Sequence, residues 1–341
     1  MKWTDKLARI MAACAVLALL AAAKPANAGS LSADTIALFP KNVGEFAYAD
    51  LKQARTMKWF PALQEQMLPE RFKQFEKFLA SAGVDPNTTV EELAWGLVGQ
   101  SAAKQEGKAT VAADVPESEE IVGIALGNFN PDSTEAYFKQ QKLATSKSRG
   151  YTLFAFGSGV GPSDLFFFFI DSSKAAFGHK QLLEKMIEIR YGGEEGLLAN
   201  DKLFSLINEV NGSGVVWAVL DASYTRLAMS QLAPEVQQFP EAAKLVQNMQ
   251  SMIISATASS GLEAKFQAVC GAPEDANTLS QLMTAGLLYK KYQASKDNPE
   301  LGQLLDQASV TPSGERVVIR LSVSDDQMTS LIKRNTFSFK M

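Results

Sequence analysis

Six consecutive apolar residues at positions 165–170 (Leu-Phe-Phe-Phe-Phe-Ile) stand between Asp164 and Asp171. A bilayer-spanning helix needs about 20 apolar residues, so this short run predicts a strand that is covered on both faces. Residues 151–156 before it and 175–177 after it predict neighbouring strands of an antiparallel meander. We therefore expect this run to lie at the centre of a sheet.

Helical periodicity appears earlier in the chain. Between residues 57 and 80 apolar side chains recur every three or four positions, and Pro69 interrupts the pattern, so we expect a kinked helix or two short ones. Thr88 or Thr89, followed by Glu91 and Glu92, predicts the capped start of a short helix that ends near Trp95.

The second half of the chain repeats much of this order. Residues 214–221 match residues 43–50, with an aromatic residue, Ala, two further residues and Asp in the same places. The pattern then predicts a hairpin that turns at residues 259–261 and a long helix from Pro273. A short helix from Pro299, a terminal hairpin and a helix capped by Ser324 come after it. The apolar face predicted for the long helix consists of Leu279, Leu282, Met283, Leu287, Leu288 and Tyr292.

These patterns predict an α+β fold made of two copies of one unit, with mainly antiparallel strands and helices packed on the sheets. Residues 29–195 form the first predicted repeat and residues 196–341 the second. The matched stretch leaves open whether the two halves share one sheet.

The chain resembles a loosely defined group of exported bacterial proteins of unknown function. The features that carry the resemblance are Pro40, the strand at residues 46–50, its counterpart at residues 217–221, the long helix and the terminal hairpin. The resemblance implies a duplicated α+β exported protein and brings no catalytic residue with it.

The first 28 residues predict a secretory signal peptide. Lys2, Lys6 and Arg9 precede an apolar segment at residues 10–23, and Ala26-Asn27-Ala28 supplies the small residues that a signal peptidase reads. We expect a mature protein that starts at Gly29, with no membrane span after cleavage, in the periplasm or outside the cell. Residues 29–34 are small and polar, so we expect them to be poorly ordered.

Cleavage leaves 29 of the 33 basic residues and 36 of the 37 acidic ones, a formal charge of about −7. Nucleic acids and anionic membrane surfaces require clustered positive charge, so neither is an expected partner. Cys270 is the one cysteine of the mature chain, so no intramolecular disulfide can form, and it is expected to be a small buried apolar residue.

Several short motifs match those of catalytic or ligand-binding sites but lack the neighbouring elements that such sites require. Ser101 and Lys104 have the Ser-x-x-Lys spacing of penicillin-recognising enzymes, but the companion elements are absent. The Gly157–Gly161 segment is rich in glycine, yet a strand follows it where a phosphate loop requires a helix. His179 is the only histidine, and no pattern ties it to Cys270. The sequence therefore assigns no catalytic, cofactor-binding or metal-ligating residue, and no cofactor.

One aromatic stripe has two interpretations. Trp59, Phe60, Phe72 and Phe75 share one helical face, which is typical of core packing. Their density beside Pro61 and Pro69 also suits a groove or partner surface, and they are the candidate interaction residues.

The sequence thus favours an exported soluble non-catalytic protein that binds a small ligand or another envelope protein, with oligomer formation left open. A structural component of the envelope and an extracytoplasmic hydrolase with a Ser/Lys or carboxylate site are the alternatives. An enzyme should show polar groups that converge in a pocket with shifted pKa values, whereas a binding protein should show an apolar groove or patch.

Overall fold

The computed structural model describes residues 29–67, 70–100, 118–161, 164–232, 240–258, 261–297 and 299–334. The strands are β1 (Glu45–Asp50), β2 (Val90–Gln100), β3 (Ser118–Gly127), β4 (Thr145–Ser148), β5 (Tyr151–Phe156), β6 (Leu165–Asp171), β7 (Lys174–His179), β8 (Val216–Leu220), β9 (Ser251–Ala258), β10 (Leu262–Val269), β11 (Ser309–Ser313) and β12 (Arg316–Val323). The helices are α2 (Ala33–Ile36), α3 (Leu51–Ala54), α4 (Phe60–Met67), α5 (Glu70–Ser81), α6 (Pro131–Gln141), α7 (Lys180–Arg190), α8 (Asp201–Val210), α9 (Ala222–Leu232), α10 (Pro240–Gln247), α11 (Pro273–Asp297), α12 (Pro299–Asp306) and α13 (Asp325–Lys333).

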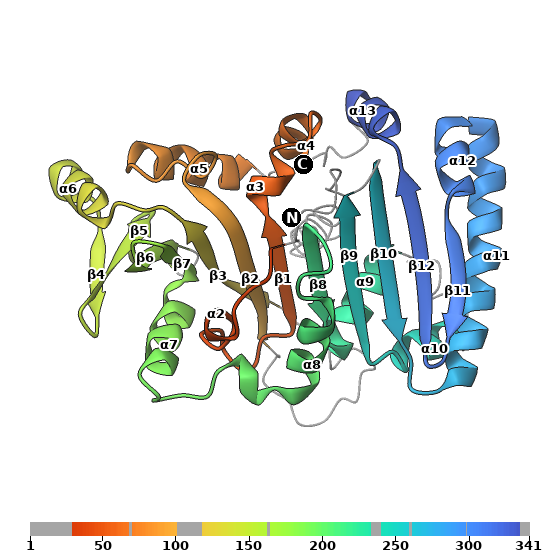
Figure 1. Cartoon of the computed structure of the whole chain (residues 1–341). Helices are drawn as coiled ribbons and strands as arrows, with labels where there is room; N and C mark the ends of the chain where they lie inside the picture. Colours follow the sequence, from red (N-terminus) through yellow and green to blue (C-terminus); the bar gives the residue numbers. More distant parts are fainter. Residues whose placement is uncertain are drawn as a thin grey trace.

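One antiparallel sheet runs through both halves of the chain. Its twelve strands lie in the order β11-β12-β10-β9-β8-β1-β2-β3-β7-β6-β5-β4 (Figure 1). β1 and β8 pair with each other in the middle, so the two halves share a continuous sheet. The predicted α+β class with mainly antiparallel strands is confirmed.

The join between the halves is symmetric in its pairing. Ala47 lies opposite Ala218, and these two residues occupy the same place in the matched stretches of sequence. Outward from the join, the first half adds β2, β3, β7 and β6, and the second adds β9, β10, β12 and β11. Asp50 and Asp221 each accept a hydrogen bond from the backbone N–H three residues later, at 2.7 and 2.9 Å. The strand order therefore matches over the five strands nearest the join, and β5 and β4 have no counterpart in the second half. The origin of both halves from one unit remains a prediction.

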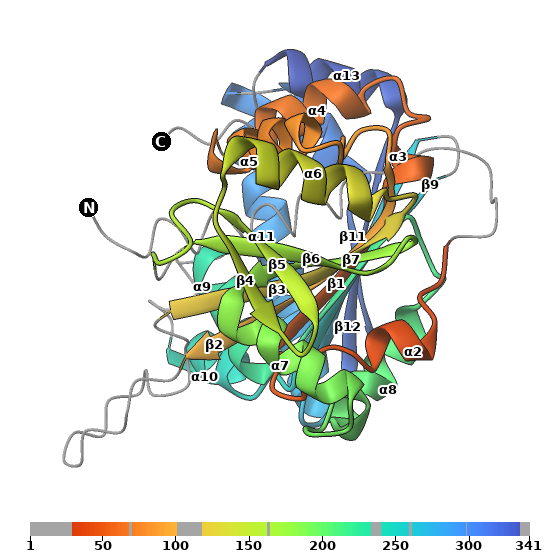
Figure 2. The ribbon, with the colours of Figure 1, turned by 90° about the vertical axis from the view of Figure 1, so that its left-hand side faces the viewer.

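Helices pack on both faces of the sheet. α2, α7 and α8 cover one face over the first half and the join, where Tyr48 and Trp217 stack with their ring centroids 5.4 Å apart. α4, α9 and α13 contribute to the core on the opposite face. Figure 2 shows β5, β6 and β7 between α5 and α6 on one side and α7 on the other.

The phenylalanine run forms β6 and is buried on both faces, as predicted. Phe166 and Phe168 pack in the core beneath α7, and Phe167 packs against Phe138 and Phe154 on the α6 side. The prediction that this run is the centre of the sheet was wrong. β6 is the third strand from one edge, because the second half extends the sheet beyond β1.

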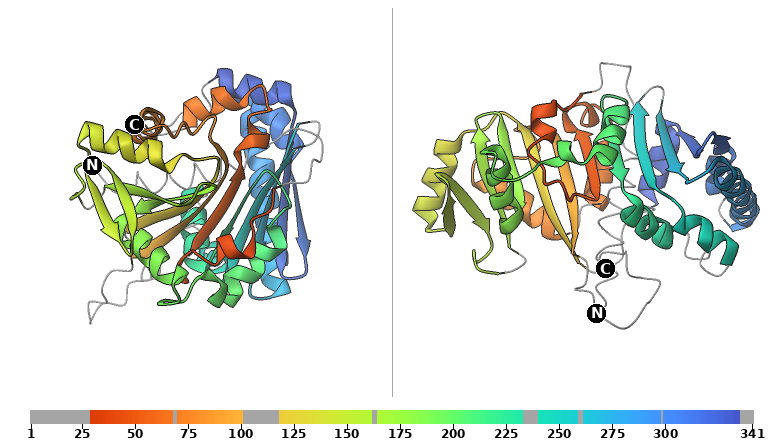
Figure 3. Two further views of the ribbon diagram at one scale, coloured as in Figure 1. Left: turned by 60° about the vertical axis from the view of Figure 1, so that its left-hand side comes forward. Right: turned by 90° about the horizontal axis from the view of Figure 1, so that it is seen from below.

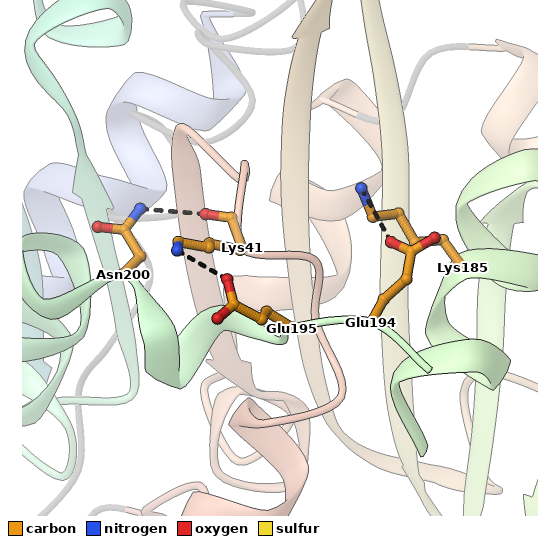
Figure 4. Close-up of polar contacts among 5 residues, drawn as sticks. All are labelled: Lys41, Lys185, Glu194, Glu195 and Asn200. Carbon is orange, nitrogen blue, oxygen red and sulfur yellow. Dashed lines mark hydrogen bonds and ion pairs between the residues drawn. The ribbon is translucent and has the colours of Figure 1, made fainter. Parts of the chain in front are cut away.

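Figure 4 shows how the connection between the two predicted repeats is held. Glu195 forms an ion pair with Lys41 at 2.8 Å, Asn200 Nδ2 donates to the Lys41 carbonyl at 3.1 Å, and Lys185 pairs with Glu194 at 3.3 Å. These ion pairs are exposed and contribute little to stability. The backbone bond from Leu197 N–H to the Phe39 carbonyl, at 2.7 Å, adds a buried attachment.

Local sequence signals were wrong at two places. Residues 90–95 belong to β2 and not to a helix: Thr88 and Thr89 close a turn on the Asp85 carbonyl, and pairing with β1 outweighs the local helix signal. The start of the mature chain, expected to be poorly ordered, is held in place, since Leu31 is buried and its backbone bonds to Asn211.

α11 stands beside β11 at the edge of the sheet (Figures 1 and 3). Of its predicted apolar face, Leu279 is buried and Met283 is half-buried, whereas Leu282, Leu288 and Tyr292 are exposed. Among the described residues no helix combines the length and the apolar character that crossing a membrane requires.

Candidate functional site

The second half of the sheet has one polar face. Side chains alternate between the two faces of a strand, and on β10 the residues Leu262, Ala264 and Ala268 face the core while Lys265 and Gln267 face the other way. In Figure 1 no helix lies in front of β9, β10 and β12, apart from α8 at their lower end. Polar side chains on this face can therefore meet a ligand.

A pocket with a volume of about 350 Å³ opens on this face. Small-molecule sites typically have volumes of about 300–1,000 Å³, so it suits a small ligand. Its floor consists of strand residues and its wall of residues from α8 and the following turn. We call it the β9–β12 pocket; it is lined by Glu209, Val210, Ser213, Ser255, Thr257, Glu263, Lys265, Gln267 and Arg320.

Two polar side chains of the floor are buried without a protein partner. Ser255 is 6% exposed and Gln267 is 8% exposed. Neither the Ser255 hydroxyl nor the Gln267 carboxamide makes a side-chain hydrogen bond with any described residue. Buried polar groups are costly unless they are hydrogen-bonded, so both groups are available to a ligand or to water inside the pocket.

A row of three polar residues crosses the pocket floor. Ser255 lies directly opposite Lys265, and Lys265 lies directly opposite Arg320 on the next strand. Residues in such positions have Cβ atoms about 4.5–5.5 Å apart, and like charges there repel each other. The two cations therefore favour an anion between or above them.

Two acidic residues, Glu209 and Glu263, line the pocket together with the two cations. Arg316, just outside the pocket, holds Glu209 through both guanidinium NH groups, one of them at 2.8 Å. These hydrogen bonds hold the pKa of the Glu209 carboxyl below its usual range, against the opposing effect of burial. Glu263 lies 3.9 Å from Arg320, and Lys265 forms no ion pair within the described ranges.

Two residues of the pocket floor have side chains of the types used in nucleophilic catalysis. Ser255 and Lys265 could act as nucleophile and base, because they lie opposite each other. β9 and β10 are interior strands whose backbone N–H groups are taken up by pairing on both sides, so these two strands supply no oxyanion hole. The described residues contain no group of three or more His, Cys, Asp or Glu placed to hold a metal ion.

The aromatic residues that the sequence put forward as an interaction surface lie in the core. Trp59 and Phe60 are buried, and the Trp59 indole N–H donates to Asp325 on α13 at 2.8 Å. Phe75 is buried against Phe156, with ring centroids 5.0 Å apart. The side chain of Phe72 falls outside the described set. The packing interpretation of the stripe thus holds for the three described residues, which offer no surface to a partner.

The structure separates His179 from Cys270. His179 ends β7, and its Nδ1 accepts a hydrogen bond from Ile121 N–H at 3.0 Å. Cys270 follows β10, and burial raises the pKa of its thiol. Six strand spacings lie between them, on the order of 30 Å across a flat sheet. They cannot act as a dyad. The Ser101–Lys104 motif lies outside the described residues.

The glycine-rich loop binds a carboxylate of its own chain. Asp164 Oδ2 accepts hydrogen bonds from the Ser158 hydroxyl and from the N–H groups of Gly159 and Gly161, at 2.8–3.0 Å. Burial tends to raise the pKa of Asp164, but these bonds hold it below its usual range. The loop is the hairpin connection that the sequence indicated, and its anion-binding groups are already occupied.

No family model matches the chain, and no curated protein sequence matches it significantly. Solved structures similar to it include crystal form I of TP0453, with a TM-score of 0.46, 12% identity and coverage of 91% of this chain and 100% of that chain. Crystal form III of TP0453 has a TM-score of 0.48 and 11% identity over 89% of this chain and 99% of that chain. At this level of similarity neither match informs the site.

Sequence reasoning missed the β9–β12 pocket. Glu263, Lys265 and Gln267 alternate with apolar residues, which is the ordinary pattern of a strand with one face in water. The pocket can be recognised only from the pairing of the strands. Ser255 and Arg320 lie in one row with Lys265 only once the register of three strands is known.

Proposed function

We propose that this is an exported, non-catalytic protein that binds a small polar ligand with an anionic group in the β9–β12 pocket. The ligand's anionic group lies against Lys265 and Arg320. Its hydroxyl or amide groups bond to Ser255 and Gln267. The observation that carries this proposal is the row of Ser255, Lys265 and Arg320 across the pocket floor.

The chemistry of the pocket floor supports the same interpretation. Lys265 and Arg320 are like charges in neighbouring positions, which repel each other, although Glu263 lies 3.9 Å from Arg320. The polar side-chain atoms of Ser255 and Gln267 are accessible from the pocket. An anion with hydrogen-bonding groups offsets the repulsion and bonds to both polar side chains.

Native mass spectrometry on mature protein taken gently from its own cell envelope tests the proposal. We expect a retained small mass whose composition includes an acidic group and several oxygen or nitrogen atoms. A retained protein instead would support the envelope-interaction function expected from the sequence. Protein that carries no small molecule, and gains no thermal stability from a panel of small carboxylates and phosphates, would contradict the proposal.

A hydrolase is the second candidate, because Ser255 and Lys265 face each other in the pocket. In that case a serine-reactive fluorophosphonate should label the protein, and both Ser255→Ala and Lys265→Met should abolish labelling while the protein remains folded. The binding proposal predicts no labelling of the wild-type protein.

A further inference from the structure

Gly29, the first residue after the predicted cleavage site, lies against three polar side chains of the sheet. A Cβ added to it would stand 2.2 Å from Tyr48 Oη, 3.3 Å from Asp50 Oδ2 and 3.5 Å from Glu92 Oε2. A contact of 2.2 Å is far too short for a carbon and an oxygen, so a larger residue here would displace the Tyr48 hydroxyl. The start of the mature chain therefore lies beside two carboxylates.

Specific contacts hold this segment in place. Leu31 is buried, its N–H donates to Asn211 Oδ1, and Asn211 Nδ2 donates back to its carbonyl, both at 2.9 Å. Ser32 then caps α2 through a bond from Thr35 N–H at 3.2 Å. The backbone two residues after Gly29 is thus fixed to the C-terminal end of α8.

The two carboxylates have no close ion-pair partner among the described side chains. Asp50 and Glu92 are direct neighbours on β1 and β2. Asp50 uses Oδ1 to cap α3, which leaves Oδ2 towards Gly29, and Glu92 Oε2 accepts a hydrogen bond from the Tyr48 hydroxyl at 2.8 Å. The charge of Lys52 acts on both carboxylates, but its ammonium group pairs with Glu91 at 2.8 Å. Burial, and next the negative charge of Asp50, raise the pKa of Glu92.

We propose that cleavage after Ala28 creates a cation that pairs directly with these carboxylates: the new α-ammonium group of Gly29 binds to Asp50 and Glu92. Hydrolysis by a signal peptidase breaks the Ala28–Gly29 bond, adds water, and leaves a carboxylate on Ala28 and an amine on Gly29 that takes up a proton. Before cleavage the same nitrogen is an uncharged amide. The ion pair therefore belongs to the processed protein alone and distinguishes it from the precursor.

This ion pair requires cleavage at the predicted site and is independent of the β9–β12 pocket.

The second half of the sheet has no matching carboxylate site, because Val219 and Ser251 occupy the positions that match Tyr48 and Glu92. The asymmetry fits a single N-terminus.

Competitive acetylation of the exported protein with acetic anhydride, followed by mass spectrometry of the N-terminal peptide, measures the pKa of this amine. An ordinary α-amino group has a pKa of about 7.7–8.0. Pairing with two carboxylates favours the charged form, so we expect a pKa at least about one unit higher and a reaction at neutral pH about tenfold slower. An N-terminus other than Gly29, or an ordinary pKa in the folded protein, would overturn the proposal.

Matched variants separate the ion pair from general burial. Glu92→Gln keeps an acceptor for Tyr48 and Asp50→Asn keeps a cap for α3, yet each should move the α-amino pKa back towards its ordinary value. Glu135→Gln is the control, since Glu135 lies on α6 and pairs with Lys139, and it should leave the pKa unchanged. Equal effects of Glu135→Gln and Glu92→Gln would count against a specific site.

A chain that retains Ala28 gives a second readout. The added residue moves the ammonium group away from the carboxylates, so the melting temperature should fall by about 2–4 °C in the wild-type background. In the Glu92→Gln background the same addition should have a smaller effect. An unchanged melting temperature in the wild-type background would contradict the proposal even if the variants fold normally.

Discussion

The five strands nearest the join have the same order in both halves of the sheet, yet the surface chemistry on one face is opposite. Over the first half and the join this face is apolar and lies beneath α2, α7 and α8, with Phe166, Phe168 and Trp217 in the core. Over β9, β10 and β12 the same face is polar and carries the β9–β12 pocket. The same strand order therefore supports an apolar core in one half and a polar pocket in the other, and the side chains make the difference.

On the opposite face the contrast is reversed. Glu45 is fully buried and Glu119 is mostly buried, and burial followed by the charge of Glu45 raises the pKa of Glu119 to about 8. Val216 and Leu262 occupy the matching positions of the second half. The first half thus has buried carboxyl side chains at positions where the second half has apolar core residues.

The largest predicted effect comes from the covered face of the first half. Phe167→Asp and Phe168→Asp should each prevent folding, because either places a carboxylate in an apolar core on one side of β6. Circular dichroism and soluble yield are the measurements. Val160→Asp, on a side chain that is 90% exposed, is the control and should fold normally. A well-folded Phe168→Asp variant would show that this face is not buried.

The next effect concerns Glu119 and pH. Its folded pKa of about 8 lies above an unfolded value of about 4.3, so the folded state binds its proton more tightly. The stability that this proton confers is therefore complete below about pH 4 and is lost as the pH rises towards 8. Glu119→Gln should remove this loss and raise the stability at pH 8 by on the order of 4 kcal/mol, since each pKa unit corresponds to about 1.4 kcal/mol. Urea unfolding at pH 4.5 and pH 8 measures it, and equal pH dependence in both proteins would contradict the assignment.

A smaller stabilising effect is expected in the pocket. Gln267→Leu removes a buried carboxamide without a protein partner and should stabilise the empty protein by about 1 kcal/mol. Gln293→Leu, on the exposed surface of α11, is the control and should change stability by less. Thermal unfolding measures both, and a clear loss of stability in Gln267→Leu would show that the carboxamide already has a partner.

The smallest effect is expected at the ion pair of Arg316 and Glu209, which joins β12 to α8. Both side chains are about a third exposed, so Arg316→Gln should cost about 1 kcal/mol or less. Because the folded pKa of Glu209 is lowered, its contribution is present above about pH 4.3 and is lost as the pH falls through the folded value. The free energy of unfolding, measured with urea, should be lower for the variant than for the wild type at pH 7. In strong acid the two proteins should have the same free energy of unfolding.

Much of the fold could be predicted from the sequence, because local patterns determine it. The helices α4 and α5, the pairing of β9 with β10 and the helix cap at Ser324 all agree with the sequence pattern, which had left open one kinked helix or two short ones at residues 57–80. The strand at residues 90–95 could not be predicted, because β1 supplies its pairing from a distant part of the chain. The centre of the sheet was misplaced for the same reason, since it depends on β1 meeting β8.

The candidate site was less predictable than the fold. Ser255, Lys265 and Arg320 are each unremarkable on their own strands, and only the register of three strands puts them in one row. The aromatic stripe was visible in the sequence, but periodicity does not say whether an apolar face meets a partner or the protein's own core. Trp59 and Phe60 meet the core.

The central claim is that the β9–β12 pocket holds a small anionic ligand. Native mass spectrometry on wild-type, Lys265→Met and Lys147→Met proteins, prepared identically from the cell envelope, tests it most directly. Lys147 is an exposed residue on β4, at the far edge of the sheet. We predict one small mass retained by the wild type and by Lys147→Met and lost from Lys265→Met. The same mass in all three proteins, or in none, would contradict the account.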